Sequence, residues 1–247
     1  MSTKPRAIIL SGYGLNCEDE TAFAFETAGA RADIVHINDL IANKKMFKKY
    51  QILVVPGGFS YGDDTGSGKA YANKLKQHLD HELHEFLACD TLMAGICNGF
   101  QILTSAGILP GALTHNDSQR YISKWVEVVA EQSISPWLTN SPRPSLIDKR
   151  ESNPLPLIYK GDQRGLLREA SIELPIAHGE GKYIPDPKRA PTIAFRYVEN
   201  PNGSTDDIAG IVGYNGRVLG MMPHPERAQF PWQRGGNGLQ IFKNAVK

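Results

Sequence analysis

Residues 91–107 have the sequence TLMAGICNGFQILTSAG. The apolar run 93–96 predicts a buried strand, and residues 99–106 predict a helix directly after it. Between them stands Cys97, framed by two glycines in the pattern G-x-C-x-G. This spacing is typical of a nucleophile elbow, a sharp strand-to-helix turn that presents a reactive side chain at a helix N-terminus. The competing interpretation is a small, inert core cysteine.

The flanking sequence favours a sheet that would carry this turn. Short apolar runs predict strands and longer amphipathic runs predict helices, at 7–10, 17–29, 33–37, 52–55 and 69–88. Alternating strands and helices indicate an α/β fold. We predict a three-layer, mostly parallel sheet with helices on both faces, of the flavodoxin-like kind. Sites in such sheets gather at the carboxyl ends of the strands, where the loop 56–64 and Cys97 both lie.

The second half of the chain has a different pattern. Strands are predicted at 125–130, 192–197, 208–212 and 218–222. The last two are joined by GYNG, a hairpin signal. We predict one domain, 1–247, with a Pro-rich excursion at about 133–171 that lies outside the core.

Bulk composition limits the function classes. The 247 residues carry a net charge of +1, which provides no global field for nucleic acid or a membrane surface. No apolar run is long enough to span a bilayer, and the N-terminus does not have the pattern of a signal peptide. Three scattered cysteines predict neither a disulfide framework nor a zinc cluster. We expect a cytoplasmic protein.

A cysteine nucleophile needs a base and a group that orients the base. The stretch MMPHPER supplies His224 and Glu226, which are two residues apart and so point to the same side of an extended backbone. The flanking prolines favour that extended geometry. The simpler interpretation is an exposed histidine beside an exposed glutamate.

The stretch VVPGGFSYGDD, residues 54–64, follows a predicted strand. Its consecutive glycines leave backbone N–H groups free to face a ligand, so this loop is a candidate oxyanion hole together with the N–H of Asn98. An ordinary glycine-rich turn is the alternative.

These blocks together resemble the class I (triad-type) glutamine amidotransferases. GxCxGxQ followed much later by HPE carries the resemblance to the family. PGGFSYGD, LPGAL, HGEG and NPNGS are similar to one branch of it. That branch feeds ammonia to a separate ATP-dependent synthetase that aminates formylglycinamide ribonucleotide in purine biosynthesis. The resemblance covers nearly the whole chain.

The resemblance implies a role for each matching residue. Cys97 would attack the side-chain amide of L-glutamine, His224 would move the proton, and Glu226 would support His224. The oxyanion would be held by the backbone N–H groups of Gly58 and Asn98. Substrate-binding positions would be Phe59, Gln101, Asn116, Ser118, Tyr121, His178 and Glu180.

The resemblance also implies partners. The synthetase would be a second protein, with a small third subunit as a further candidate, and ATP and magnesium would bind to the synthetase. No cofactor is expected in this chain. The excursion is longer than the compact form of the family requires, and we interpret it as a surface for the synthetase.

Alternatives and weaker signals accompany this prediction. Another amidotransferase with a different acceptor, a cysteine peptidase or stress protein of the same fold, and a non-catalytic binding module all fit the elbow. HLDHELHE, residues 78–85, lacks the HExxH spacing, so we expect a solvated helix face and no metal. For Cys17 and Cys89 we expect structural roles, with Cys17 bordering the site.

Overall fold

The chain folds around one mixed sheet whose parallel half carries the elbow. The computed structural model describes residues 4–63, 66–131, 135–139 and 171–247. In this part of the chain, nine strands pair in the order β2-β1-β3-β4-β11-β10-β9-β6-β7, and β5 pairs separately with β8. The bounds are β1 (Arg6–Ser11), β2 (Arg31–His36), β3 (Ile52–Val55), β4 (Leu92–Ile96), β5 (Ala112–Thr114), β6 (Ile122–Ala130), β7 (Ile172–His178), β8 (Lys182–Ile184), β9 (Thr192–Tyr197), β10 (Ile208–Gly213) and β11 (Val218–Met221).

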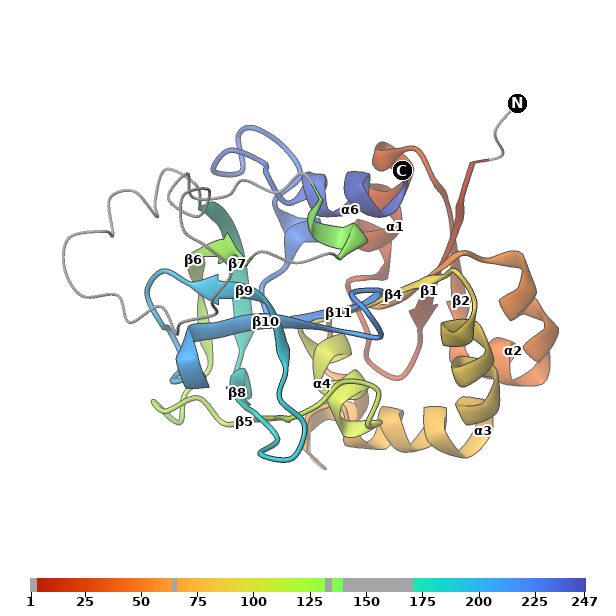
Figure 1. Ribbon diagram of the computed structural model, residues 1–247, viewed down its shortest axis with the longest axis horizontal. Helices are drawn as coiled ribbons and strands as arrows, with labels where there is room; N and C mark the ends of the chain where they lie inside the picture. Colours follow the sequence, from red (N-terminus) through yellow and green to blue (C-terminus); the bar gives the residue numbers. More distant parts are fainter. Residues whose placement is uncertain (1–3, 64–65, 132–134, 140–170) are drawn as a thin grey trace.

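Helices cover both faces of the sheet, which confirms the predicted three-layer α/β fold. The helices α1 (Glu18–Ala28) and α6 (Leu239–Ala245) pack together on one face, and α3 (Lys69–Ala88) and α4 (Asn98–Ser105) pack together on the other (Figure 1). The short α2 (Ile37–Ala42) follows β2. No helix in the described ranges is long and apolar enough to cross a membrane.

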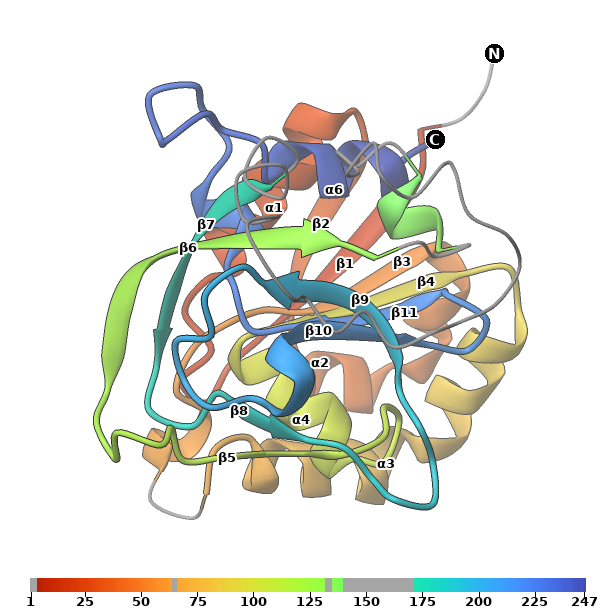
Figure 2. The ribbon, with the colours of Figure 1, turned by 60° about the vertical axis from the view of Figure 1, so that its left-hand side comes forward.

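The sheet is parallel on one side of β11 and antiparallel on the other. The pairs β2–β1, β1–β3, β3–β4 and β4–β11 are parallel. The pairs β11–β10, β10–β9, β9–β6 and β6–β7 are antiparallel. Figure 2 shows β4, β11, β10 and β9 following one another across the sheet. The predicted parallel arrangement therefore describes the half that holds the site.

The predicted hairpin is the point of reversal. Tyr214, Asn215 and Gly216 have φ angles of 50°, 56° and 85°, which turn the chain from β10 into β11. A positive φ is unfavourable for a residue with a Cβ atom, and asparagine tolerates it best after glycine.

Helix α3 buries the predicted stripe, which includes Leu75, Leu79, Leu83 and Phe86. On its solvent side, the imidazoles of His81 and His84 lie 3.7 and 3.8 Å from carboxylates four residues away on the same helix. That side of the helix is the solvated face that the sequence predicts.

The beginning of the predicted excursion belongs to the core, which corrects the sequence-based boundary. The 3-10 helix η3 (Pro136–Leu138) buries Trp137 and Leu138 almost completely. Trp137 Nε1 donates to Arg217 O at 3.0 Å, and Ser135 Oγ donates to Gly216 O at 2.7 Å. The surrounding prolines and charged residues gave no sequence signal that these two apolar residues are buried. Residues 140–170, with the interpretation as a synthetase surface, lie outside the described residues.

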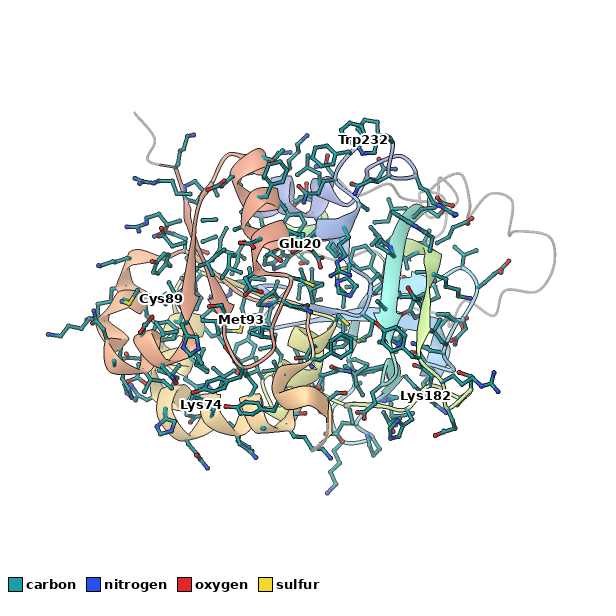
Figure 3. The ribbon with its side chains drawn as sticks, turned by 180° about the vertical axis from the view of Figure 1, so that it is seen from behind. Glu20, Lys74, Cys89, Met93, Lys182 and Trp232 are labelled. Atoms are coloured by element: carbon teal, nitrogen blue, oxygen red, sulfur yellow. The ribbon has the colours of Figure 1, made fainter. Side chains whose placement is uncertain are left out.

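Replacing Trp137 by alanine should destabilise the protein by about 3–5 kcal/mol, because the change removes a fully buried aromatic side chain. Urea unfolding of the full chain measures this. Trp232→Ala is the matched control, since this side chain is 78% exposed and sits on the outward loop labelled in Figure 3. Equal losses for the two variants would contradict a core role for residues 135–139.

Candidate active site

Cys97 stands on a strained turn between β4 and α4. Its φ is 50° and its ψ is −107°, as a nucleophile elbow requires. A Cβ atom at Gly99 would lie 1.8 Å from Val55 O, and one at Gly95 would lie 2.6 Å from Gly99 O. Only glycine fits at these two positions, so the G-x-C-x-G pattern has a steric cause. Cys97 is 4% exposed, and its Sγ donates to Ala177 O at 3.7 Å.

The loop after β3 lies beside this turn. Leu15 and Gly58 form an isolated antiparallel bridge whose hydrogen bonds are made by Asn16 N to Gly57 O and by Phe59 N to Gly14 O. The N–H of Gly58 therefore lies outside the bridge bonds. A Cβ atom at Gly58 would lie 2.5 Å from Gly14 O. This close approach of two backbones explains the glycine.

Asn98 begins α4 and ties the loop to the elbow. Its side-chain Oδ1 accepts from Ser60 N at 3.1 Å, and its Nδ2 donates to Gln101 Oε1 at 2.8 Å. The first N–H groups of a helix have no partner inside the helix. The N–H of Asn98 and that of Gly58 are thus the two donors expected near the Cys97 turn.

His224 and Glu226 form a buried pair. His224 Nδ1 lies 2.6 Å from Glu226 Oε1, and both residues are 2% exposed. They follow β11, which runs parallel to β4 and pairs Met221 with Ile96. The two strands therefore bring His224 and Cys97 to the same edge of the sheet.

Neighbouring groups change the pKa of the His224 imidazole. Burial alone would lower the pKa of His224, but the Glu226 carboxylate, Cys97 and Cys17 raise it well above its usual value. His224 Nε2 is buried without a hydrogen-bond partner in the described part of the chain. The arrangement is that of a base whose one nitrogen is oriented and whose other nitrogen is available for proton transfer.

Gln101 and Glu180 connect the HGEG loop to α4 by a hydrogen bond. Gln101 Nε2 donates to Glu180 O at 2.6 Å, and Glu180 Oε2 accepts from Ser67 N at 3.3 Å. His115 Nε2 lies 3.8 Å from the other oxygen of the same carboxylate. The structure thus brings these two predicted residues together at the border of the site.

Asn116 supports His178. The Asn116 Oδ1 atom lies 3.1 Å from His178 Nδ1 and accepts from Gly181 N at 3.1 Å, while Asn116 Nδ2 donates to His178 O and Arg120 O at 2.9 Å. Asn116 is fully buried and its amide is used by these contacts. His178 Nε2 is buried without a partner among the described residues. Burial, with the neighbouring His224, lowers the pKa of His178 to about 4, so its ring is neutral at physiological pH.

Three predicted residues lie at the surface. Phe59 and Tyr121 are 41% and 52% exposed and their ring centroids are 6.1 Å apart. Ser118 is exposed, and its Oγ accepts from Arg120 N at 3.4 Å. These three side chains are exposed, whereas His224 and Glu226 are buried.

The structure adds two residues to the predicted site. The first is Cys17. Its Sγ, one ring nitrogen of His224 and one carboxylate oxygen of Glu226 all lie within 4.8 Å of one another. Tyr197 on β9 has a buried hydroxyl without a hydrogen-bond partner among the described residues, and burial, then the nearby Cys97, raises its pKa. The sequence offered a signal only for Cys17, which follows the first strand.

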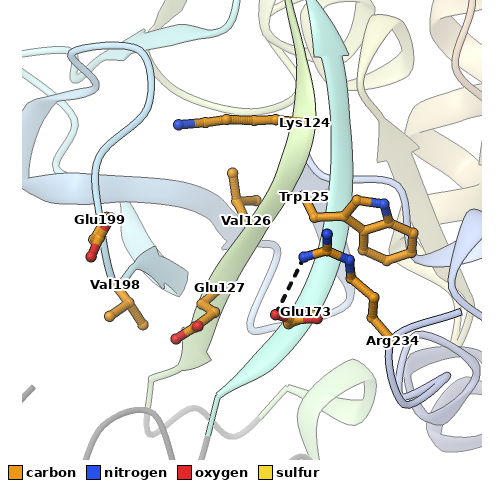
Figure 4. A pocket seen from close by; sticks show the side chains of 8 residues that line it. All are labelled: Lys124, Trp125, Val126, Glu127, Glu173, Val198, Glu199 and Arg234. Carbon is orange, nitrogen blue, oxygen red and sulfur yellow. Dashed lines mark ion pairs between the residues drawn. The ribbon is translucent and has the colours of Figure 1, made fainter. Parts of the chain in front are cut away.

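Two hollows lie apart from this constellation. One, of about 160 Å³, lies along β6 and β7, and there Arg234 stacks on Trp125 and approaches Glu173 at 3.7 Å (Figure 4). The other, of about 540 Å³, adjoins Gln51 and Thr91 at the amino ends of β3 and β4. Neither is lined by Cys97, His224 or Glu226.

Comparison with known families defines the class of the protein. The model of the CobB/CobQ-like glutamine amidotransferase domain matches residues 4–145 and 163–247. The unmatched stretch lies within the predicted excursion. The protein is thus a glutamine amidotransferase, and the predicted resemblance to the class is confirmed.

Individual relatives narrow the class. The chain is 40% identical to the phosphoribosylformylglycinamidine synthase subunit PurQ of Methanococcus maripaludis, over 98% of this chain and 97% of the relative. It is 39% identical to PurQ of Pyrobaculum aerophilum, again over 98% and 97%. The structure of PurLQS from Thermotoga maritima matches with a TM-score of 0.77, 33% identity and 99% and 98% coverage. The chain therefore belongs to the PurQ family of phosphoribosylformylglycinamidine synthase subunits, as the PGGFSYGD and HGEG blocks predict.

Replacing His178 by asparagine should reduce the loss of stability in acid. The unfolded chain binds a proton at His178 below about pH 6.5, and the folded protein does so only near pH 4, so the wild type loses stability as the pH falls through this window. Asparagine does not titrate, and the acid-induced loss should shrink by about 3 kcal/mol.

Urea unfolding between pH 7 and pH 4 measures this difference. His84→Asn, on the exposed face of α3, is the control and should follow the wild type. A pH dependence of His178→Asn parallel to that of the wild type would contradict a neutral, buried His178.

Proposed function

We propose that this chain, as a glutaminase subunit of phosphoribosylformylglycinamidine synthase, hydrolyses L-glutamine through a thioester on Cys97. The observation that carries the proposal is the strained Cys97 turn beside a buried His224–Glu226 pair. Cysteine, base and orienting carboxylate are the three parts that nucleophilic catalysis of amide hydrolysis needs.

The proposed reaction has two halves. The Cys97 sulfur bonds to the side-chain carbonyl carbon of glutamine, and the thiol proton passes through His224 to the departing nitrogen. The C–N bond breaks, and ammonia leaves. Water then attacks the thioester carbon, gives its proton to His224, and releases glutamate with Cys97 restored as a thiol. In both halves the N–H groups of Gly58 and Asn98 hold the carbonyl oxygen as it gains negative charge.

The remaining site residues have two proposed roles. Phe59, Ser118 and Tyr121 meet the substrate at the rim. His178 contributes a neutral imidazole whose buried Nε2 has no partner among the described residues, and the fixed amide of Asn116 supports the ring. Gln101 and Glu180 fix the border between α4 and the HGEG loop, where glutamine would lie.

The ammonia is proposed to pass to a separate ATP-dependent synthetase subunit that aminates formylglycinamide ribonucleotide. Support comes from the likeness of this chain to the structure of PurLQS from Thermotoga maritima. ATP and magnesium belong to the synthetase, and the chemistry above uses only side chains and backbone groups of this chain. All three cysteines are free, which suits a reducing cytoplasm.

Replacing Cys97 by serine should abolish glutamine-dependent amination by the complex and leave ammonia-dependent amination intact. Only the supply of ammonia requires the thiol, because the synthetase acts on ammonia whatever its source. Steady-state assays with glutamine or with an ammonium salt separate the two. Loss of both activities in a correctly assembled complex would contradict the proposed role. Retention of both activities would contradict it as well, because Cys97 would then not be needed for glutamine hydrolysis.

Replacing Glu226 by glutamine should slow glutamine turnover, but kcat should remain about 10- to 100-fold higher than that of Cys97→Ala. A carboxylate that orients the base matters less than the nucleophile itself, as in other triads. The ratio of kcat for the two variants, measured in the same complex, tests this. Equal damage would assign Glu226 a direct part in bond making.

A further inference from the structure

We propose that Cys17 is a positioning residue for glutamine hydrolysis, which ties the oxyanion loop to the imidazole of His224. The inference rests on the proposed function of Cys97 and His224. Cys17 is 1% exposed and lies at the start of α1, far in sequence from both partners. Its backbone and its side chain each make one of the two connections.

The backbone connection reaches the loop after β3. Cys17 N and Asn16 N both donate to Gly57 O, at 3.2 and 3.0 Å. Gly57 directly precedes Gly58, whose N–H is one of the two proposed oxyanion donors. Two donors on one carbonyl fix the peptide plane between Gly57 and Gly58, and that plane contains the Gly58 N–H.

The side-chain connection reaches the base. A Cβ atom at Gly57 would lie 2.7 Å from His224 Cε1 and 3.1 Å from Cys17 Sγ, so the thiol and the imidazole meet over this glycine. Cys17 also contributes to raising the pKa of His224. The ring of His224 is therefore confined on one side by Glu226 and on another by the Cys17 sulfur.

Arg227 holds the thiol in place. Its Nη2 donates to Cys17 Sγ at 3.1 Å, and the thiol lies 3.5 Å from Asn16 Oδ1, to which it donates. Glu20 approaches the same guanidinium at 3.8 Å. A guanidinium in this position disfavours a cation between Cys17, His224 and Glu226, so positioning explains the cluster better than metal binding does.

The sharpest test compares Cys17→Ala with Cys17→Ser in the complex with the synthetase. Alanine leaves space beside the imidazole, and small misplacements of a catalytic group cost up to about 100-fold in rate. We expect kcat for glutamine to fall about 10- to 100-fold with KM changed less than threefold. Serine, of similar size, should restore kcat to within about threefold of the wild type. Ammonia-dependent amination should not change.

Two control variants separate positioning from a general loss of structure. Thr21→Val removes the Thr21 Oγ1 bond to Cys17 O and leaves the thiol untouched. Cys89→Ala removes an exposed cysteine, which Figure 3 shows well apart from Glu20 on α1. Thr21→Val should lower the melting temperature with kcat retained, and Cys89→Ala should change neither.

A double-mutant cycle tests whether Arg227 acts through the sulfur. Arg227→Met should lower kcat about 3- to 10-fold, and the double variant with Cys17→Ala should be no slower than Cys17→Ala alone. Additive losses would overturn the proposed link between Arg227 and Cys17.

The positioning role fails if Cys17→Ala keeps wild-type kcat, or if its loss appears equally in ammonia-dependent amination. It also fails if Cys17→Ser is as slow as Cys17→Ala. Those outcomes leave Cys97→Ser inactive with glutamine, whereas failure of the proposed function itself would show as glutamine turnover by Cys97→Ser.

Discussion

The contact between the beginning of α4 and the end of β3 is the constraint on which the site depends. Any Cβ atom at Gly99 would overlap Val55 O, so the helix backbone rests directly on the strand backbone. This contact sets how sharply the chain turns at Cys97. Because the loop with Gly57 and Gly58 begins immediately after Val55, the same contact also constrains the distance from Cys97 to the proposed oxyanion donors. One steric requirement thus aligns two parts of the proposed site.

The two halves of the sheet make different contributions to the site. The parallel half supplies the proposed nucleophile after β4, the proposed oxyanion loop after β3 and the proposed base after β11. The antiparallel half closes the site, because β7 brings Ala177 O to Cys97 Sγ and Pro175 O to the N–H of His224, at 3.7 and 2.9 Å. The hairpin between β10 and β11 joins the halves. A wholly parallel sheet would require crossover helices where β7 now approaches the site.

The sequence predicted the parallel half well because its signals are local. The apolar runs of β1, β3 and β4, the leucines of α3 and the glycines around Cys97 each determine their own structure. The short strands β5 and β8, by contrast, have three residues each. They are stable only when they pair with each other, and they lie far apart in the sequence. The burial of Trp137 was not predicted, because the residue lies in a proline-rich segment and is buried by α6 and the 213–216 turn. Isolated apolar residues of this kind do not reveal a packing partner.

The same distinction holds within the site. Cys97, His224 and Glu226 were recognisable because each motif is contiguous, and the structure places the His224–Glu226 contact where the two-residue spacing predicts it. The contacts of Cys17 with Gly57, His224 and Arg227 join three separate segments, and no spacing along the chain encodes them. Sequence identified Cys17 as a neighbour of the site, but only the fold shows what it touches.

Of the nine buried side-chain polar atoms without a partner among the described residues, five belong to residues of the proposed site. Ser60 Oγ, His178 Nε2, Tyr197 Oη, His224 Nε2 and Glu226 Oε2 are all buried and unpaired within the described residues. Each such atom costs about 1–3 kcal/mol relative to a satisfied one. Sequences that fold tolerate few of these groups, and five among the residues of one proposed site are a concentrated cost. The cost is consistent with a polar substrate whose amide and carboxylate groups would satisfy these atoms. The contacts of Asn98 with Ser60 and of Asn116 with His178 hold two of these residues in place.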